Sequence, residues 1–92
     1  MHKSPGSTAA TRLAALGNEH RLRMVELLRQ GERCVCEIAP EFEIDQSVVS
    51  RHLAVLEQAG IVTSRRDGRR VLYRLADRRV LRLIDMAAEL KP

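Results

Sequence analysis

Apolar residues recur at helical spacing along most of the chain, and glycine, asparagine and proline divide them into short segments. The first predicted helix covers residues 9–16 and stops at Gly17 and Asn18. The second covers residues 19–30, where a wide apolar arc predicts a mostly buried helix, and it ends at Gly31. Residues 34–42 predict a short third helix, which Pro40 ends or distorts.

The next segment has the clearest helical pattern. Asp45 is a candidate N-cap for a helix over residues 46–59, after a turn at residues 43–44. Val49, Leu53 and Leu56 fall at i, i+4 and i+7 and form one apolar stripe. Gly60 fits the position that follows a helix end, so we expect the helix to stop there.

A hairpin and a last helix complete the pattern. Residues 62–66 and 69–75 predict two strands joined by Asp67-Gly68, a pair favoured in two-residue type I′ turns. Asp77 can cap a helix that reaches residue 90 and carries more apolar surface than a terminal helix leaves exposed. An isolated hairpin is marginal in water, so we expect it to pack beside the helices.

This order of elements is that of a winged helix-turn-helix. We therefore predict a mainly α fold with a β-hairpin wing (α+β), in which residues 9–92 form a single DNA-binding domain. Residues 1–8, which include Pro5 and Gly6, are predicted to be a flexible tail. There is no internal repeat and no second domain in the pattern.

Length and charge narrow the function further. A chain of 92 residues is one domain that buries only about 60–65% of its unfolded surface, so a homodimer would add useful burial. The net charge is +4, and 14 of the 16 basic residues are arginine, whose planar fork suits phosphates and guanine edges. A cluster of arginines favours a nucleic acid over a membrane as partner. The cluster comprises Arg65, Arg66, Arg69, Arg70, Arg74, Arg78, Arg79 and Arg82.

The same sequence predicts a cytoplasmic protein. No apolar run approaches the roughly 20 residues that cross a bilayer, and the N-terminus has no apolar signal segment. Cys34 and Cys36 are the only cysteines, and two cysteines separated by one residue are poorly placed to staple a small secreted fold.

The predicted helix over residues 46–59 has a small polar face opposite its apolar stripe. A recognition helix reads the major groove with its N-terminal residues, and we predict DNA contacts from that end. An ordinary solvated face explains the same pattern, and a histidine at the edge of the apolar face is more often packed than a ligand. The candidates are Gln46, Ser47, Val48, Ser50, Arg51 and His52.

The wing supplies the remaining DNA candidates. With the predicted turn, Arg66 lies opposite Arg69 and Arg65 lies opposite Arg70. Directly opposed like charges destabilise a hairpin, whereas a polyanion beside them removes the conflict. We therefore predict that these four arginines contact DNA, with solvated turn charges as the alternative reading.

The residues quoted so far resemble one known family. Residues 47–56, Ser-Val-Val-Ser-Arg-His-Leu-Ala-Val-Leu, are similar to the recognition helix of the ArsR/SmtB family of arsenic- and metal-responsive repressors. Residues 16–23, 59–62 and 68–75 are similar to its second-helix entry, the approach to its wing and its returning wing strand. The resemblance implies a repressor that an inducer releases and that forms homodimers through its first and last helices. The implied interface residues are Leu13, Leu16, Val80, Leu83, Ile84 and Ala87.

Residues 32–38, Glu-Arg-Cys-Val-Cys-Glu-Ile, resemble the inducer site of that family. Members with Cys-Val-Cys there typically sense trivalent arsenic and antimony or, in a related branch, cadmium and lead. The resemblance thus implies As(III) or Sb(III) as inducer on Cys34 and Cys36, with no cofactor needed for DNA binding. The third Cys of many arsenic sensors falls at Ala39, which leaves a small-molecule thiol or water to complete the site. The last helix has no His, so we do not expect the family's other metal site.

The chemistry of the two cysteines suggests a mechanism. Soft thiolates favour thiophilic ions. Residues i and i+2 of an ideal helix point about 200° apart, so Cys34 and Cys36 are expected to bind one ion only if the first helical turn unwinds. Such unwinding would disfavour the DNA-bound geometry, and DNA would in turn weaken inducer binding.

Other functions stay open on the sequence. A redox or reactive-sulfur sensor would oxidise the same cysteines, although a disulfide across one residue closes a strained ring. Both cysteines can also be incidental, one of them packed as a small hydrophobe. We expect no enzyme, because the chain lacks Cys-x-x-Cys, a βαβ pattern and a Gly-rich phosphate loop. A winged helix used only for protein contacts would show no salt-dependent DNA binding.

Overall fold

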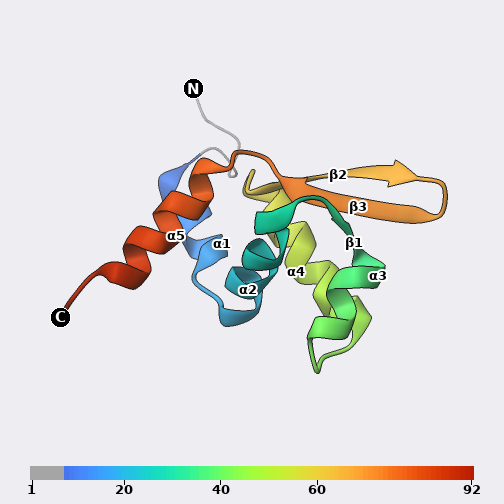
Figure 1. The fold of residues 1–92 in the computed structure, drawn as a ribbon, viewed down its shortest axis with the longest axis horizontal. Helices are drawn as coiled ribbons and strands as arrows, with labels where there is room; N and C mark the ends of the chain where they lie inside the picture. Colours follow the sequence, from blue (N-terminus) through green and yellow to red (C-terminus); the bar gives the residue numbers. More distant parts are fainter. Residues whose placement is uncertain (1–7) are drawn as a thin grey trace.

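The computed structural model describes residues 8–92, in which helices pack around a small antiparallel sheet (Figure 1). This mainly α fold with a hairpin wing confirms the predicted fold class. The elements in chain order are α1 (Ala9–Leu16), α2 (Glu19–Leu27), the 3-10 helix η2 (Leu28–Gln30), β1 (Arg33–Cys34), α3 (Val35–Ile38), the 3-10 helix η3 (Ala39–Glu41), α4 (Gln46–Gln58), β2 (Val62–Asp67), β3 (Arg70–Leu75) and α5 (Arg79–Glu89).

Polar side chains fix the starts of α1 and α2. Thr8 Oγ1 accepts a hydrogen bond from Thr11 N–H at 3.0 Å, and Asn18 Oδ1 accepts one from Arg21 N–H at 3.1 Å. Each bond satisfies an amide that a helix start leaves unpaired. Thr8 is thus the N-cap of α1 and not part of a flexible tail, whereas the rest of the predicted tail lies outside the described residues.

The first helix of the helix-turn-helix is shorter than predicted. Residues 34–42 do not form one helix, because Cys34 is extended (φ −83°, ψ 160°) and α3 has only four residues. Pro40 lies in η3, which continues the chain after α3. The extended Cys34 belongs instead to β1, a strand that the hydrophobic pattern did not predict.

The second helix of the motif, α4, begins after Asp45 as predicted and ends in a Schellman turn. The N–H of Ile61 donates to the carbonyl of Leu56 at 2.9 Å, and the N–H of Gly60 donates to that of Glu57 at 3.0 Å. Gly60 has a φ of 77°, a left-handed conformation that favours glycine. This turn directs the chain from α4 straight into the wing.

The register of the wing differs from the prediction by one residue. Asp67 lies opposite Arg70, and Arg66 lies opposite Val71. The two-residue turn is therefore Gly68-Arg69 rather than Asp67-Gly68. Gly68 alone in this turn has a positive φ, 63°, which matches a type II′ turn with glycine first. The observed register places an acid opposite a base at the tip and avoids the two predicted arginine–arginine pairs, which would repel each other.

Strand β1 makes the wing part of a three-stranded sheet with the order β1-β3-β2. Arg33 lies opposite Tyr73, and Cys34 lies opposite Leu72. The pairing connects the cysteine segment directly to the returning strand of the wing. Any rearrangement of residues 33–36 therefore acts on a strand that also carries Arg70 and Arg74.

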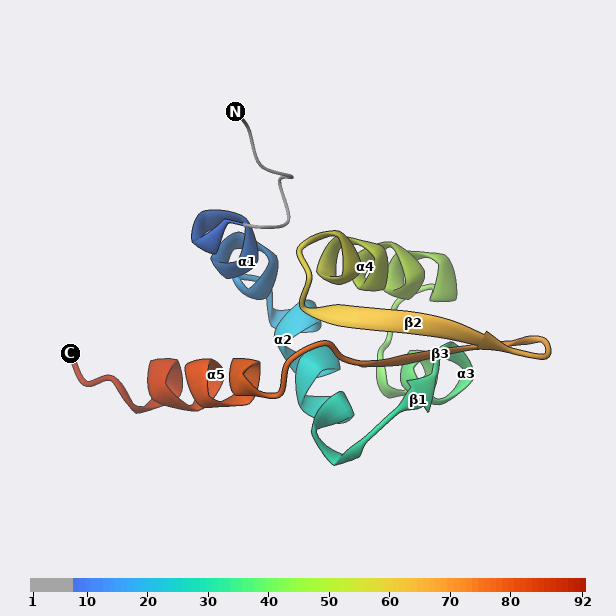
Figure 2. The same cartoon turned by 90° about the horizontal axis from the view of Figure 1, so that it is seen from above.

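The core is mainly aliphatic, with Phe42 and Tyr73 added, and lies where α2, α3 and α4 meet the sheet. The predicted α4 stripe of Val49, Leu53 and Leu56 is completely buried, as is Met24 of α2. Figures 1 and 2 place the hairpin tip and α5 at opposite ends of the molecule. Within residues 8–92, none of the helices has the length and apolar character that a membrane span requires.

Candidate DNA-binding surface and cysteine pair

The N-terminal half of α4 presents polar side chains to solvent. Gln46, Ser47, Ser50 and Arg51 are exposed, and Val48 is half-buried beside them. None of the four polar side chains forms an ion pair or a side-chain hydrogen bond within the described residues. Their donors are thus available to phosphates and base edges.

His52 differs from the other α4 candidates because α2 holds it. Its Nδ1 lies 3.0 Å from Nη1 of Arg21, whose Nε donates to the carbonyl of Ala15 at 2.6 Å. Its ring also lies 5.6 Å from the ring of His20. Burial, followed by the positive charges of Arg21 and His20, lowers the pKa of His52 below its usual 6.5. These contacts agree with the packing role for His52 that the sequence favoured.

The four wing arginines fall into two groups. Arg65 forms a two-point pair with Glu32, with nitrogen–oxygen distances of 2.7 and 2.8 Å, and Arg70 lies 3.6 Å from Glu37. Arg66 and Arg69 are exposed and have no ion pair or side-chain hydrogen bond within residues 8–92. The predicted stacking of like charges is therefore wrong, and the arginines free to meet an anion are Arg66 and Arg69.

The cysteine pair lies at the junction of β1 and α3. Cys34 is 1% exposed, Cys36 is exposed, and their sulfur atoms are bonded to each other. The two Cα atoms are 5.2 Å apart, inside the usual range for a disulfide. The expectation that the sulfurs diverge unless a helical turn unwinds is wrong, because Cys34 precedes the helix. The expectation that a one-residue spacing disfavours a disulfide is wrong for the same reason.

Two acidic residues connect this pair to the wing. Glu37 Oε1 accepts a hydrogen bond from Cys34 N–H at 2.9 Å and is the atom that lies nearest Arg70. Glu32, which precedes β1, holds Arg65. Arg65 keeps the pKa of Glu32 below its usual value, so this carboxylate stays charged. Sequence reasoning missed both contacts, although the acids at positions 32 and 37, which flank the two cysteines, were a visible signal.

The cysteine pair offers two sulfur atoms as candidate donors for a thiophilic ion. No group of three or more His, Cys, Asp or Glu side chains that could hold a metal ion occurs in the part of the chain that the structure describes. The adjacent sulfurs fit a soft ion once they are reduced.

An apolar groove lies between α1 and α5, at the other end of the molecule. It has a volume of about 430 Å³, and Leu13 and Leu83 on its walls are 54% and 43% exposed. Ala87 is also exposed, Val80 and Ile84 are half-buried, and Leu16 is buried in the core. Of the predicted interface residues, Leu13, Leu83 and Ala87 therefore offer the most uncovered surface.

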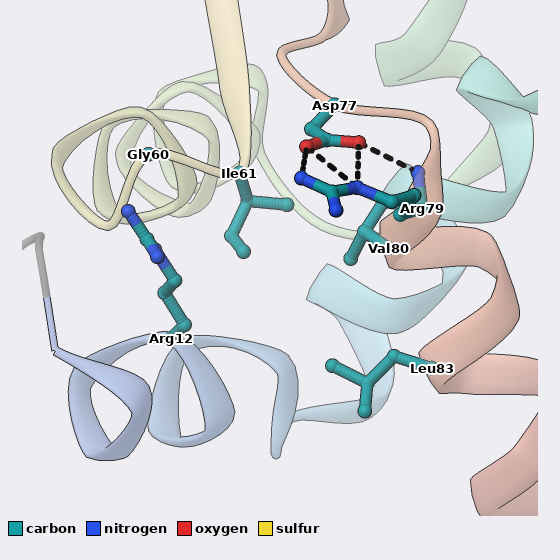
Figure 3. Close-up of a pocket in the computed structure, with 7 residues that line it drawn as sticks. All are labelled: Arg12, Gly60, Ile61, Asp77, Arg79, Val80 and Leu83. Carbon is teal, nitrogen blue, oxygen red and sulfur yellow. Dashed lines mark hydrogen bonds and ion pairs between the residues drawn. The ribbon is translucent and has the colours of Figure 1, made fainter.

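A second hollow lies between α1 and the start of α5 (Figure 3). Asp77 accepts hydrogen bonds there from the N–H of Arg79 at 2.9 Å and from its guanidinium at 2.7 Å. These bonds lower the pKa of Asp77 to about 2. The prediction that Asp77 is the cap of α5 is wrong by one position, because the N-cap is Arg78. Asp77 instead accepts from the N–H of Arg79, the first residue of α5. Arg12 lies across this hollow and donates to the carbonyl of Ala59.

The match to a known family covers the whole helix-turn-helix. The sequence profile described as "Bacterial regulatory protein, arsR family" matches residues 18–64, from the N-cap of α2 into β2. The chain belongs to the arsR family of bacterial regulatory proteins. The predicted resemblance is therefore confirmed, and the matched residues include the exposed α4 face and the start of β2.

Individual members of the arsR family support this assignment. The "HTH-type transcriptional repressor SmtB" of Mycobacterium tuberculosis is 43% identical over 78% of this chain and 53% of its own length. The "Arsenic resistance transcriptional regulator ArsR1" of Pseudomonas putida is 49% identical over 65% of this chain and 48% of its own length. The chain thus spans about half the length of these curated relatives. Both relatives are named as transcriptional regulators.

A solved structure agrees with the fold. The winged helix-turn-helix DNA-binding domain Mb0332 of Mycobacterium bovis, residues 1–100, is described as homodimeric in solution. It superimposes with a TM-score of 0.77 at 38% identity, over 86% of this chain and 73% of that one. The winged helix-turn-helix arrangement of this arsR-family chain is therefore shared with a relative of known structure.

Proposed function

We propose that this protein is a homodimeric transcriptional repressor that binds double-stranded operator DNA and that trivalent arsenic or antimony releases. The observation that carries the proposal is the position of the bonded Cys34 and Cys36. Cys34 lies on β1, a strand of the same sheet as the wing, and Cys36 follows in the first turn of α3. Glu32 and Glu37, on either side of the pair, hold two wing arginines. An inducer site and a DNA-binding surface thus share one structural element.

The DNA surface consists of the exposed α4 residues and the wing. Ser47, Ser50 and Arg51 supply donors where a recognition helix enters the major groove. Arg66 and Arg69 supply unpaired positive charges that bind phosphates or the narrow minor groove next to that major groove. The naming of the Mycobacterium tuberculosis relative as a repressor supports the direction of regulation.

The dimer forms through the groove between α1 and α5. Its exposed Leu13 and Leu83, together with Ala87, are covered when two copies meet. The homodimer described for the Mycobacterium bovis relative supports this arrangement. We expect Leu83→Asp to give a monomer of retained helicity, as measured by sedimentation and circular dichroism. A dimer of unchanged mass would contradict this interface.

The inducer is held by the reduced cysteine pair. Two thiolates fit a soft trivalent ion better than they fit zinc, which takes four protein ligands in a structural site. The name of the Pseudomonas putida relative, which refers to arsenic resistance, supports this choice among thiophilic ions. The third donor of the site is not among the described residues and is considered in the next subsection.

Release from DNA follows from the contacts between the cysteine segment and the wing. Glu37 contacts the backbone of Cys34 and the side chain of Arg70 at once. A ligand on the cysteines repositions this segment and changes which wing charges face the DNA. No helical turn has to unwind, because the sulfurs already lie side by side.

Fluorescence anisotropy of reduced protein on DNA from its own promoter tests the inducer. We expect arsenite or antimonyl tartrate to release the DNA from wild-type protein but not from Cys34→Ser or Cys36→Ser. Both variants should bind DNA as tightly as wild type in the absence of the ion. DNA binding that neither ion disturbs would refute the proposed inducer but not the proposed repressor. Release by cadmium or lead alone would show that the protein responds to those metals instead.

A redox-responsive repressor is the second candidate, and the sulfur–sulfur bond between Cys34 and Cys36 favours it. Oxidation removes two protons and two electrons from the dithiol and passes them to peroxide or a persulfide. Release of DNA by peroxide that dithiothreitol reverses, with no response to arsenite, would establish this candidate. Release by arsenite under reducing conditions would establish the first.

A further inference from the structure

A hollow of about 270 Å³ lies directly against the cysteine pair, between the start of α4 and the tip of the wing. Cys34, Val35 and Cys36 form one wall, and Arg69, Arg70 and Val71 form another. Gln46 and Ser50 of α4 complete the lining. Two cysteines, two arginines and two uncharged polar residues therefore line one space.

Cys34 and Cys36 supply one ligand fewer than a trivalent arsenic or antimony ion takes. A trivalent ion takes three thiolates, and the described residues supply two of them, with no third metal-ligating side chain grouped with the pair. Cys36 is exposed, so a donor from solution can approach the pair from the hollow. The missing ligand is thus expected on the side that the arginines face.

The arginines that line the hollow are not fully paired with acidic residues. Arg69 has no ion pair or side-chain hydrogen bond anywhere in residues 8–92. Arg70 has one acidic neighbour, Glu37, at 3.6 Å, and half of its side chain remains exposed. A guanidinium binds a carboxylate with two parallel hydrogen bonds, and the adjacent Gln46 and Ser50 can donate to the same oxygens.

We infer that this hollow binds a low-molecular-weight thiol that carries a carboxylate. Its sulfur completes the inducer site beside Cys36, and its carboxylate pairs with Arg69. The inference rests on the proposed function and adds the chemical class of the third ligand. Neutral and cationic thiols of similar size lack the group that Arg69 recognises.

The small thiol serves both as the reductant of the Cys34–Cys36 bond and as the third sulfur ligand. Two small thiols reduce the Cys34–Cys36 bond and leave as their own disulfide, with both protons retained on the cysteines. Arsenous acid then exchanges three hydroxide groups for the two protein sulfurs and one further small thiol. Each thiol proton leaves with a hydroxide, so three waters are released.

The position of the hollow gives this ligand a second effect. Arg69 is one of the two wing arginines that are free to meet a phosphate. A carboxylate bound to Arg69 removes that charge from the DNA surface. An acidic thiol therefore releases DNA more completely than a neutral thiol at equal occupancy by arsenic.

The test measures arsenite binding to the reduced protein without DNA, by native mass spectrometry and by ultraviolet absorption of the arsenic–sulfur bonds. Three monothiols are compared at equal concentration: mercaptosuccinate, 2-mercaptoethanol and cysteamine. The variants are Arg69→Gln and, as matched control, Arg74→Gln, an exposed arginine of β3 outside the hollow. Comparison between variants cancels the affinity of each free thiol for arsenic.

We expect wild type and Arg74→Gln to form a protein–arsenic–mercaptosuccinate adduct about fivefold more tightly than the 2-mercaptoethanol adduct, as for a well-formed exposed ion pair. Cysteamine should bind most weakly, and Arg69→Gln should lose the preference for the acidic thiol. The inference would be overturned if wild type bound the three thiols with equal affinity or if Arg69→Gln kept the preference for the acidic thiol. Either result would leave the proposed arsenic site on the two cysteines standing. Failure of arsenite to bind with any thiol would overturn the proposed function as well.

Discussion

Removal of the charge on Glu32 should strengthen DNA binding. Glu32 holds Arg65 at two points, 2.7 and 2.8 Å, and so withdraws one wing arginine of each protomer from a phosphate. In Glu32→Gln the carboxylate charge is gone, and Arg65 joins Arg66 and Arg69 as a free cation. The variant therefore tests whether the acids around the cysteine pair control the wing.

The salt dependence gives the magnitude. Each phosphate that a protein neutralises adds about −0.9 to the slope of log K against log salt concentration. Two protomers each gain one arginine, so the slope should steepen by about 1.8 for the dimer. The affinity gain should be largest at low salt and should shrink as salt screens the added contacts.

The assay is fluorescence anisotropy over a series of salt concentrations, with Glu89→Gln as matched control. Glu89 is an exposed acid on α5, at the end of the molecule away from the wing, and it changes the net charge equally. We expect the control to keep the wild-type slope. An unchanged slope in Glu32→Gln would refute the idea that Glu32 restrains Arg65, and weaker binding would show that the pair positions Arg65 for DNA.

Three further predictions concern stability and titration. Because the pKa of His52 is lower in the folded protein than in the unfolded chain, the unfolded chain binds the proton at higher pH, and stability is lost as pH falls below about 6.5. Urea unfolding at pH 7.5 and 5.5 should show this loss of stability, and His52→Gln should reduce the loss. Arg79→Gln should return the pKa of Asp77 from about 2 toward its usual 3.8, as followed by NMR titration of the carboxyl carbon. Leu53→Ala, at a fully buried site, should lower the free energy of unfolding in urea by about 3–5 kcal/mol at fixed protomer concentration. Val55→Ala, at a site 39% exposed on the same helix, should lower it by under about 1 kcal/mol. Similar losses for the two variants would contradict the assigned core.

The elements that local chemistry determines were predictable from the sequence. The bounds of α1 agree with the prediction because Gly17 and Asn18 act on their immediate neighbours. Helix α4 also begins after Asp45 as predicted, although the Asp45 side chain makes no capping hydrogen bond. The Schellman turn at Gly60 follows from a glycine and the apolar residue after it. The α4 stripe is buried as expected because one helical face meets one core.

The features that depend on contacts distant in sequence were not predictable. Strand β1 exists because Arg33 and Cys34 pair with residues about 40 positions later, and two residues carry no strand pattern of their own. The wing register was wrong because the Asp-Gly preference was weighed without the pairing of Asp67 with Arg70. Glu32 and Glu37 were missed as partners of the wing for the same reason.

In the proposed mechanism the cysteine pair and the DNA surface are coupled, and this coupling can be measured as the effect of DNA on the affinity for the inducer. The affinity of the reduced protein for arsenite should be measured with and without saturating operator DNA. Coupling is reciprocal, so DNA should weaken arsenite binding by the same factor by which arsenite weakens DNA binding. An arsenite affinity that DNA leaves unchanged would refute the coupling between the cysteine pair and the DNA surface.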